Sequence, residues 1–350
     1  GVVYSHRGLV LHALTVGVVL GTKESDCVLH VVPMFHANAW GAPFASTMLG
    51  CKQVLPGRQI LDMKALCGII SDEEVSFTCG VPTIWMMLHK YLEDSGEHDF
   101  SKLHAVYSGG SAMPRHLMEE MAKKYNFNIV QAYGMTETSP LATVALPKSY
   151  MTGYPEKELY DVKTTAGMIV PCLGMLVKSL DTGKEVVWNG MEMGEVCLRG
   201  PWIADEYYKD PERNKATFKG GWLHTGDIAT IDEEGYIRLV DRTKDLIKSA
   251  GEWISSVDLE NEIMSHPKVM EAAVIGMPHE KWQERPLACV VLSPDAAGTV
   301  TEDEIIDYLK ERVAKWWVPD KVVFLDAIPK TSVGKFDKKA LRATVLPKMV

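Results

Sequence analysis

The sequence predicts an α/β protein with a parallel-sheet α/β subdomain, a small β-barrel-like subdomain and an α+β C-terminal domain. Three observations lead to this prediction. The first part of the chain alternates apolar runs with amphipathic stretches, the middle part is rich in glycine, and the last part mixes strands with helices. At 350 residues, the chain is also longer than one core usually grows, which favours two or three domains.

Residues 1–165 are expected to form a parallel sheet, because strands and helices alternate there at the spacing of βαβ units. The expected strands are the apolar runs Val28–Val32, Val75–Cys79, Ala105–Tyr107 and Asn128–Gln131. The expected helices are Pro82–Leu92 and Pro114–Lys124, the second with proline at its start. Ligands bind at the carboxyl ends of such strands, so the loops after these runs are the candidates for function.

Residues 166–242 predict a small antiparallel sheet or barrel, since glycines recur between β-prone segments such as Met175–Leu180 and Glu195–Leu198. Residues 243–350 predict a compact α+β domain that can fold alone. Its expected strands are Ala272–Ile275, Leu287–Leu292 and Val322–Phe324, and its expected helices are Val257–Ser265 and Glu302–Lys315. Ser255 or Ser256 can cap the first of these helices.

Composition narrows the class of protein. The 37 basic and 46 acidic residues give a net charge of −9, which argues against a nucleic-acid binder. The longest nearly apolar stretch, Gly8–Gly21, is broken by His12 and is shorter than the about 20 residues of a bilayer span, so no transmembrane segment is expected. Seven cysteines without a C-x-x-C pair are typical of buried, reduced thiols in a cytoplasmic protein.

Several standard catalytic motifs do not occur in the sequence. It holds no H-E-x-x-H, no G-x-G-x-x-G and no Walker sequence. Gly109-Gly110-Ser111 resembles a nucleophile elbow for three residues, but Met113 stands where the final glycine is required. A serine hydrolase is therefore disfavoured.

The loop Tyr133-Gly134-Met135-Thr136-Glu137-Thr138 follows a predicted buried strand. Backbone donors and the hydroxyl of Thr136 suit phosphate oxygens, and the lone Glu137 suits a Mg²⁺ that keeps most of its waters. A strand-to-loop turn with a solvated glutamate explains the same residues equally well.

Three further polar residues each admit a functional and a plain structural interpretation. Asp227 follows the tight turn at Gly226 and can accept from both hydroxyls of a ribose, or simply close a β-turn. Arg242 can pair with ribose or phosphate, or form a surface salt bridge. Lys335 lies on a polar loop and can reach an anionic transition state, or remain a solvated lysine.

Together and in this order, these motifs resemble the adenylate-forming acyl-CoA synthetases, and among them most the medium- and long-chain fatty-acyl-CoA ligases. The resemblance covers essentially all 350 residues. It rests on Pro33–Trp40, Tyr133–Glu137, Leu223–Asp227, Gly235–Asp245, Gly251–Ser256 and the loop that holds Lys335. One such string is weak evidence, but six strings in the same order as in the family are strong evidence. The probabilities of chance matches multiply, so their joint occurrence by chance is rare.

The resemblance implies an acid–thiol ligase with ATP, Mg²⁺, CoA and a fatty acid as its cofactor and small-molecule partners. A fatty carboxylate attacks the α-phosphate of ATP and gives acyl-adenylate and pyrophosphate. The thiol of CoA then displaces AMP and gives the thioester. Because two anions must be brought together, we expect catalysis by positioning and by cationic neutralisation.

The resemblance also implies a role for individual residues. Glu137 resembles the Mg²⁺ ligand, Thr136 a phosphate contact and Lys335 the adenylation lysine. Asp227, assisted by Arg242, resembles the ribose clamp. The implied walls of the adenine slot and the adjoining cofactor loop are Gly109, Gly110, Ser111, Gln131, Ala132, Tyr133 and Gly134.

Other residues resemble the acyl mouth, the hinge and the CoA face of the family. His36 resembles the residue at the acyl-binding mouth. Lys244 lies at the hinge about which the C-terminal domain of the family swings between the two half-reactions. Gly251, Trp253 and Ile254 resemble the face presented to the CoA arm.

The start of the sequence differs from the family pattern. The Ser/Thr/Gly-rich phosphate loop of the family should lie just before Val2, and this sequence begins at what resembles the last glycine of that loop. We therefore expect a C-terminal portion of the enzyme that is weak or inactive alone. A compensating homodimer is a further expectation, because truncation would leave apolar surface exposed.

Medium to long fatty acids are the expected substrates, since Lys315–Pro319 is typical of the fatty-acid branch. Trp40 is bulky enough to line or gate an apolar channel, and it fits a core tryptophan equally well. An aryl-CoA ligase, an acyl-carrier-protein ligase of the same family and a non-catalytic binding fragment are the alternatives.

Overall fold

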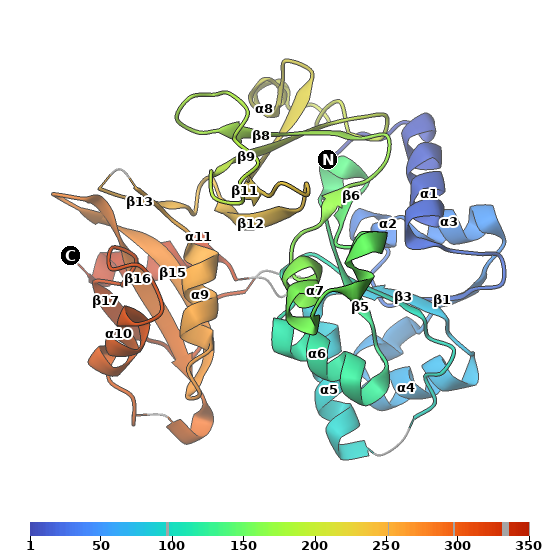
Figure 1. Cartoon of the computed structure of the whole chain (residues 1–350), viewed down its shortest axis with the longest axis horizontal. Helices are drawn as coiled ribbons and strands as arrows, with labels where there is room; N and C mark the ends of the chain where they lie inside the picture. Colours follow the sequence, from blue (N-terminus) through green and yellow to red (C-terminus); the bar gives the residue numbers. More distant parts are fainter. Residues whose placement is uncertain (96–97, 251, 297, 331–335, 350) are drawn as a thin grey trace. The chain divides into compact units, whose positions relative to one another are not determined.

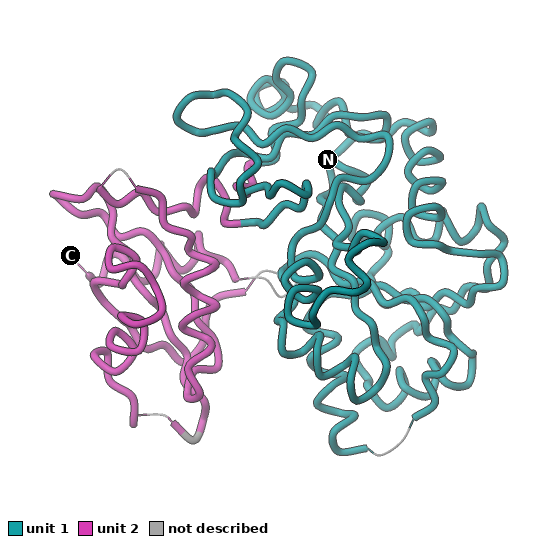
Figure 2. Tube along the Cα trace, in the orientation of Figure 1, with its two compact units in different colours: residues 1–225, 230–239 teal, residues 226–229, 240–350 magenta. Residues whose placement is uncertain are grey.

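The structure is a computed structural model that describes residues 1–95, 98–250, 252–296, 298–330 and 336–349. It confirms the predicted α/β class, with one mostly parallel sheet and two mostly antiparallel ones (Figure 1). The chain divides into two compact units (Figure 2): unit 1 holds residues 1–225 and 230–239, and unit 2 holds residues 226–229 and 240–350. The three-part division at residues 165 and 242 remains a prediction.

The main sheet of unit 1 contains the strands β1 (Cys27–His30), β2 (Lys52–Val54), β3 (Phe77–Gly80), β4 (Ala105–Ser108), β5 (Ile129–Gly134), β6 (Leu141–Val144) and β7 (Met168–Ile169). They lie in the order β2-β1-β3-β4-β5-β6-β7. β1 to β5 are parallel, whereas β6 and β7 join antiparallel. The four predicted apolar runs overlap β1, β3, β4 and β5, so the parallel sheet was correctly predicted.

The helices of unit 1 are α1 (His6–Leu20), α2 (Ala37–Trp40), α3 (Ala42–Leu49), α4 (Met63–Asp72), α5 (Pro82–Ser95), α6 (Arg115–Tyr125), α7 (Glu156–Lys163) and α8 (Pro211–Thr217). Short 3₁₀ turns are η1 (Gly57–Leu61), η2 (Thr136–Thr138) and η3 (Ser149–Gly153). The two predicted helices correspond to α5 and α6. Pro114 precedes α6, and Asn126 ends it in the left-handed conformation at φ 57°, which asparagine tolerates.

Helices bury both faces of the parallel sheet, and alternate residues of β1 show this. Leu29 packs in a core with Leu66 of α4, Trp85 of α5 and Met118 of α6. Val28 points to the opposite core, which holds Val16 of α1 and Ala45 of α3. A strand that is buried on both faces reads as a continuous apolar run, which is why β1 was predictable.

The apolar stretch Gly8–Gly21 lies almost wholly within α1. Ser5 caps this helix by accepting from the backbone N–H of Gly8 at 3.0 Å, and Gly21 ends it at φ 66°. None of the helices among the described residues is long and apolar enough to cross a bilayer.

A second sheet contains β8 (Gly174–Ser179), β9 (Gly194–Arg199), β10 (Phe218–Lys219), β11 (Trp222–Ile231) and β12 (Ile237–Arg242). Its order is β10-β11-β9-β8, and β12 pairs with β11. The predicted segments Met175–Leu180 and Glu195–Leu198 coincide with β8 and β9, which pair antiparallel. The glycine-rich part of the chain therefore forms antiparallel sheet, as predicted.

Unit 2 contains a third sheet, formed by β13 (Ile247–Ser249), β14 (Glu252–Ile254), β15 (Val269–His279), β16 (Gln283–Leu292) and β17 (Lys321–Phe324). Its helices are α9 (Ser256–Met264), α10 (Glu302–Lys310) and α11 (Lys338–Val345), with the 3₁₀ turns η4 (Pro294–Ala296) and η5 (Leu346–Lys348). The cap of α9 is Ser255, whose Oγ accepts from the N–H of Asp258 at 3.0 Å.

The predicted helix Glu302–Lys315 is too long. α10 ends at Lys310, where the N–H groups of Arg312 and Val313 both turn back to the carbonyl of Leu309 at 2.9 and 3.0 Å. One carbonyl that accepts two N–H groups tightens the last turn, which is a common way for a helix to end.

Candidate functional site

Gly109 follows β4 at the carboxyl end of the parallel sheet, between the ends of its neighbours. Its N–H donates to the carbonyl of Gly80, after β3, at 3.3 Å. A Cβ at this position would lie 2.9 Å from the carbonyl oxygen of Ala132 on β5 and 3.4 Å from the ring of Trp40. A side chain would therefore collide with β5, which explains glycine at this predicted adenine wall.

Gln131 shapes the loop that follows Gly109 and Gly110. Its buried side-chain amide accepts from the N–H of Met113 at 3.2 Å and donates to the carbonyl of Ser111 at 3.0 Å. The loop 109–113 is thus tied to β5 through one side chain. Its contact with adenine stays a prediction.

Gly134 lets the chain turn sharply at the end of β5. A Cβ here would lie 1.8 Å from the carbonyl oxygen of Pro140, so only glycine fits. The turn η2 follows, and it exposes Thr136 while it buries Glu137, which is 7% exposed. Of the two interpretations of this loop, the solvated glutamate is wrong, because burial removes the carboxylate from bulk water.

Two tyrosines flank η2. The hydroxyl of Tyr207 donates to Oε1 of Glu137 at 2.5 Å, and the hydroxyl of Tyr4 donates to the carbonyl of Thr136 at 2.5 Å. Burial, reinforced by the charge of Glu137, raises the pKa of each phenol to about 12. Both tyrosines therefore remain protonated donors at neutral pH. Sequence reasoning missed them, because a single tyrosine far away in the chain carries no pattern.

The carboxylate of Glu137 fits the role of a cation ligand. Oε1 is held by Tyr207, and no residue in the described part of the chain donates to Oε2. A carboxylate with one fixed and one available oxygen suits a hard cation that keeps several waters.

His36 and Trp40 bracket an unusual turn after β1. Ala37, Asn38, Ala39 and Trp40 all have positive φ, between 41° and 59°, so the segment labelled α2 is a left-handed turn. Such a conformation costs roughly 1–2 kcal/mol per residue without glycine. His36, half-buried, precedes the turn, and its N–H donates to the carbonyl of Pro33 at 2.9 Å.

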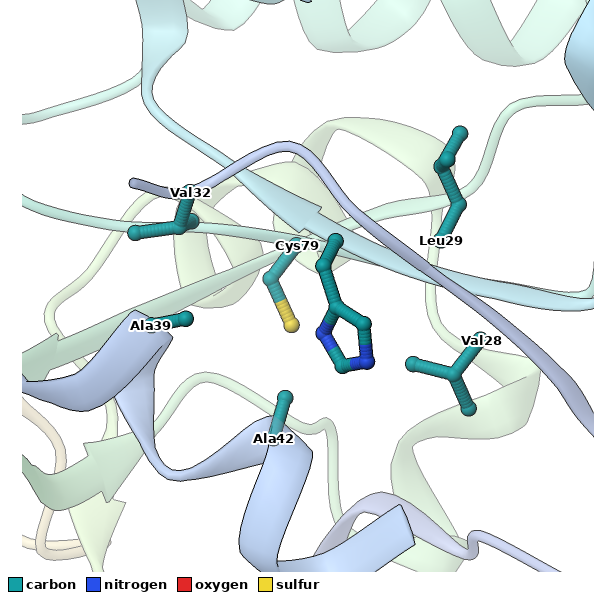
Figure 3. Close-up of a pocket in the computed structure, with 7 residues that line it drawn as sticks. Val28, Leu29, Val32, Ala39, Ala42 and Cys79 are labelled. Carbon is teal, nitrogen blue, oxygen red and sulfur yellow. The ribbon is translucent and has the colours of Figure 1, made fainter. Parts of the chain in front are cut away.

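A small apolar pocket lies beside this turn (Figure 3). Ala39 and Ala42 face Val28, Val32 and Cys79 across it. His30 also lines it and bonds through Nε2 to Oε1 of Gln53 at 2.9 Å. Apart from His30, the side chains around the pocket are apolar.

In unit 2 the structure brings Asp227 and Arg242 together. Nε of Arg242 lies 3.3 Å from Oδ1 of Asp227, whose side chain is only 12% exposed. The predicted tight turn at Gly226, and with it a β-turn closed by Asp227, is wrong, because both residues lie within the continuous strand β11, where Gly226 has φ 72°. The carbonyl of Gly226 accepts from the N–H and the hydroxyl of Thr243 at 2.9 and 3.1 Å. The ion pair agrees with both interpretations of Arg242.

Lys244 is exposed, and Trp253 is half-buried on β14, where Nζ of Lys248 lies 4.4 Å from its ring centroid. Gly251 and Lys335 lie outside the described residues, so the structure gives no position for either. The ends of the loop that holds Lys335 are described, and the N–H of Asp337 donates to the carbonyl of Pro329 at 2.8 Å.

A buried polar network anchors the start of α11. Nζ of Lys338 lies 2.6 Å from Oε1 of Glu260 on α9 and also contacts the hydroxyl of Ser256. Ser256 in turn donates through its N–H and its hydroxyl to Asp241, at 2.8 and 2.5 Å. Despite Lys338, burial raises the pKa of Glu260 to about 7. The chain just after Lys335 is therefore fixed to the core of unit 2.

Comparison with known proteins gives relatives over almost the whole chain. The chain is 48% identical over 345 residues to a long-chain-fatty-acid–CoA ligase of Thermus thermophilus, which covers 98% of this chain and 63% of that protein. It is 40% identical over 345 residues to a 3-methylmercaptopropionyl-CoA ligase of Ruegeria lacuscaerulensis, with 98% and 62% covered. The chain therefore spans less than two thirds of the length of these relatives.

The fold also matches solved structures. One is an o-succinylbenzoate CoA synthetase from Bacillus subtilis in complex with its acyl-adenylate intermediate, with a TM-score of 0.84 and 30% identity over 98% of this chain and 66% of that one. Two family models match the sequence: that of the AMP-binding enzymes over residues 1–208, and that of their C-terminal domain over residues 258–335. The chain belongs to the family of AMP-binding, adenylate-forming enzymes, as its sequence motifs predicted.

Proposed function

We propose that this chain carries the acyl-activating site of an ATP-dependent fatty-acid–CoA ligase. The observation that carries this proposal is the carboxylate of Glu137. It is buried directly after β5, Tyr207 fixes one of its oxygens, and the other accepts from no described residue. In an adenylate-forming enzyme, this is the arrangement that a nucleotide-bound cation needs.

The proposed reaction has two steps. An oxygen of the fatty carboxylate attacks the α-phosphorus of ATP, the bond from that phosphorus to the bridging oxygen breaks, and pyrophosphate leaves. The sulfur of CoA then attacks the acyl carbon, the bond to the AMP oxygen breaks, and the thiol proton is lost. The protein contributes positioning and charge neutralisation.

The proposed nucleotide contacts begin at the carboxyl ends of β4 and β5. Glu137 would hold Mg²⁺, which neutralises phosphate charge when bound, and Thr136 would contact phosphate. The segments 109–111 and 131–134 would contact the adenine and line the adjoining loop. In unit 2, Asp227 would accept from the ribose hydroxyls, with Arg242 beside it.

The remaining roles rest on the sequence motifs. Lys335 would neutralise the charge that develops during adenylation, and His36 would stand at the acyl mouth. Lys244 would be the hinge residue, and Gly251 and Trp253 would face CoA.

The proposed acid is a medium- or long-chain fatty acid. The segment Lys315–Pro319 is typical of the fatty-acid branch of the family, and Trp40 is bulky enough to line an apolar channel. The Thermus relative is named for long-chain acids, and the Ruegeria relative for a short sulfur-containing acid. Because these two relatives are named for acids of different length, the preference of this enzyme for acid length is the property to measure.

Thioester formation by the protein expressed from the complete reading frame tests this proposal. Palmitate, decanoate, 3-methylmercaptopropionate, acetate and benzoate are compared as acids with ATP and CoA, and acyl-CoA is quantified by chromatography. We expect kcat/KM to be at least about tenfold higher for decanoate or palmitate, because each further buried methylene is worth roughly 1 kcal/mol or more. Faster turnover of acetate or benzoate would refute the assignment of a fatty acid as substrate. Transfer of the acyl group only to a carrier protein would refute the assignment of CoA as the acyl acceptor.

A further inference from the structure

The partner of Glu137 lies 70 residues away in the sequence. We propose that Tyr207 is a positioning residue for the cation-binding carboxylate of Glu137: its hydroxyl holds Oε1 so that Oε2 is presented to the metal of the metal–nucleotide substrate. This inference rests on the proposed function and adds a residue to it. Tyr207 is not assigned a contact with substrate.

The hydrogen bond between Tyr207 and Glu137 is well isolated from water. Glu137 is 7% exposed and Tyr207 is 5% exposed, and their oxygens are 2.5 Å apart. Hydrogen bonds from a hydroxyl to a carboxylate are short and about twice as strong as neutral ones. Because few waters can replace the phenol, loss of its hydroxyl would leave the carboxylate free to rotate or to recruit another partner.

The phenol is itself held from several sides. The guanidinium of Arg213 lies 4.0 Å from the centroid of its ring, and the ring of Phe218 lies 5.5 Å away. The side-chain amide of Asn214 accepts from the N–H of Tyr207 at 2.6 Å and donates to its carbonyl at 3.1 Å. Tyr207 therefore has little freedom to turn its hydroxyl away.

The same segment is tied to the backbone of η2. The N–H of Ala204 donates to the carbonyl of Glu137 at 2.8 Å. Tyr4, on the other flank, donates to the carbonyl of Thr136 and so acts on the main chain. Among the described residues, Tyr207 is the one whose side chain donates to the carboxylate. This contact distinguishes positioning of the metal ligand from general support of the turn.

The test measures affinity for ATP with Mg²⁺ and with EDTA, by isothermal titration calorimetry without fatty acid. The dissociation constant in EDTA divided by the dissociation constant in Mg²⁺ is the ratio that reports the contribution of the metal to ATP binding. Partners that orient a metal ligand typically change metal affinity about 10–100-fold when they are lost. Tyr207→Phe keeps the ring contacts and removes only the hydroxyl, and we expect it to lower this ratio at least about tenfold while metal-free binding changes little.

Tyr236→Phe is the matched control. It removes a buried phenol hydroxyl that donates to the carbonyl of Leu146 at 2.8 Å, away from Glu137, and should leave the ratio unchanged. If Tyr207→Phe does not fold, as judged by its thermal melt, Asn214→Ala is measured instead and should lower the ratio in the same direction.

The outcomes separate this inference from the function on which it rests. A wild-type protein that binds ATP with a metal-dependent gain, together with an unchanged ratio in the Tyr207→Phe or the substitute variant, overturns the role of Tyr207 alone. A wild-type protein that binds no ATP, or binds it equally well without metal, overturns both proposals.

Discussion

Single residues carry the chemistry proposed for this chain. Glu137, which follows β5, is buried and accepts from the hydroxyl of Tyr207, and Asp227, within β11, pairs with Arg242. Sequence motifs identified these carboxylates because each follows a glycine closely in a string that resembles the family. Tyr207 and Tyr4 could not be predicted, since only the folded chain brings them to η2.

Asp227→Ala should chiefly weaken binding of ATP and AMP. Loss of a charged hydrogen bond to the ribose would cost about 1–3 kcal/mol, which calorimetric titration of AMP would show as a rise in the dissociation constant. Asp326→Ala removes an exposed carboxylate of the same unit and serves as the control. If AMP binds both variants equally tightly, Asp227 is not part of the nucleotide site.

Lys335→Ala should separate the two half-reactions. Adenylation should fall strongly because the variant lacks a cation for the developing phosphate charge. Thioester formation from supplied acyl-adenylate should persist. Exposed Lys339 offers a matched control in Lys339→Ala. An equal loss in both steps of Lys335→Ala would rule out a role specific to adenylation.

His12 should make unit 1 sensitive to acid. It is 1% exposed and accepts the N–H of Leu141 at 3.0 Å through Nε2, and burial lowers its pKa to about 4. The unfolded chain therefore binds more protons between pH 6.5 and about 4, so stability is fully present above pH 6.5 and is lost as pH falls toward 4. The loss should be at most about 3 kcal/mol.

Thermal melts across this pH range, for wild type and for His12→Gln, measure the effect. His12→Gln should be less stable at neutral pH but should lose less on acidification. His116 is exposed, and His116→Gln should retain the wild-type pH profile. A His12→Gln profile parallel to that of wild type would show that this histidine is not the acid-sensitive group.

Among the secondary-structure elements, the strands β1, β3, β4 and β5 were predicted correctly from apolar runs in the sequence. Such runs mark these strands because both faces of a parallel strand are buried. The edge strand β2 was missed, since Lys52 and Gln53 are exposed there. The left-handed turn 37–40 was unpredictable for a different reason: alanine and tryptophan do not favour positive φ, so only tertiary packing can impose it. The predicted length of α10 was wrong because the end of this helix depends on local backbone hydrogen bonds.

The pocket between β1, β3 and α3 yields a prediction about stability. Ala42 is 5% exposed and lines this pocket, which is too small to admit a water molecule. Ala42→Leu should therefore overpack the core and lower the free energy of unfolding by about 1–3 kcal/mol.

Thermal melts of the wild type and of both variants measure this loss. Met48→Leu changes an exposed side chain of the same helix and should leave the melting temperature unaltered. An unchanged melting temperature of Ala42→Leu would show that the core accommodates the larger side chain.

For the whole molecule, the family followed from six motifs in the family's order, and the family models confirm it. The α/β class followed from the alternation of apolar runs with amphipathic stretches, and the sheets of the structure confirm it. The swing of a C-terminal domain about Lys244 stays a prediction, as do the roles of Lys335 and Gly251, which lie outside the described residues. What sequence could not supply was the set of long-range contacts, such as the one from Lys338 to Glu260. These contacts join elements far apart in the chain, and residue type alone does not reveal them.

Fatty-acid-dependent exchange of labelled pyrophosphate into ATP reports the adenylation step without CoA. Measured on the protein from the complete reading frame, exchange should require both a fatty acid and Mg²⁺. It should fall at least about a hundredfold in Glu137→Gln, because loss of about 3 kcal/mol of electrostatic stabilisation has that effect on rate. Exchange that is absent from the wild type, or that proceeds at the wild-type rate in Glu137→Gln, would contradict adenylate formation at this carboxylate.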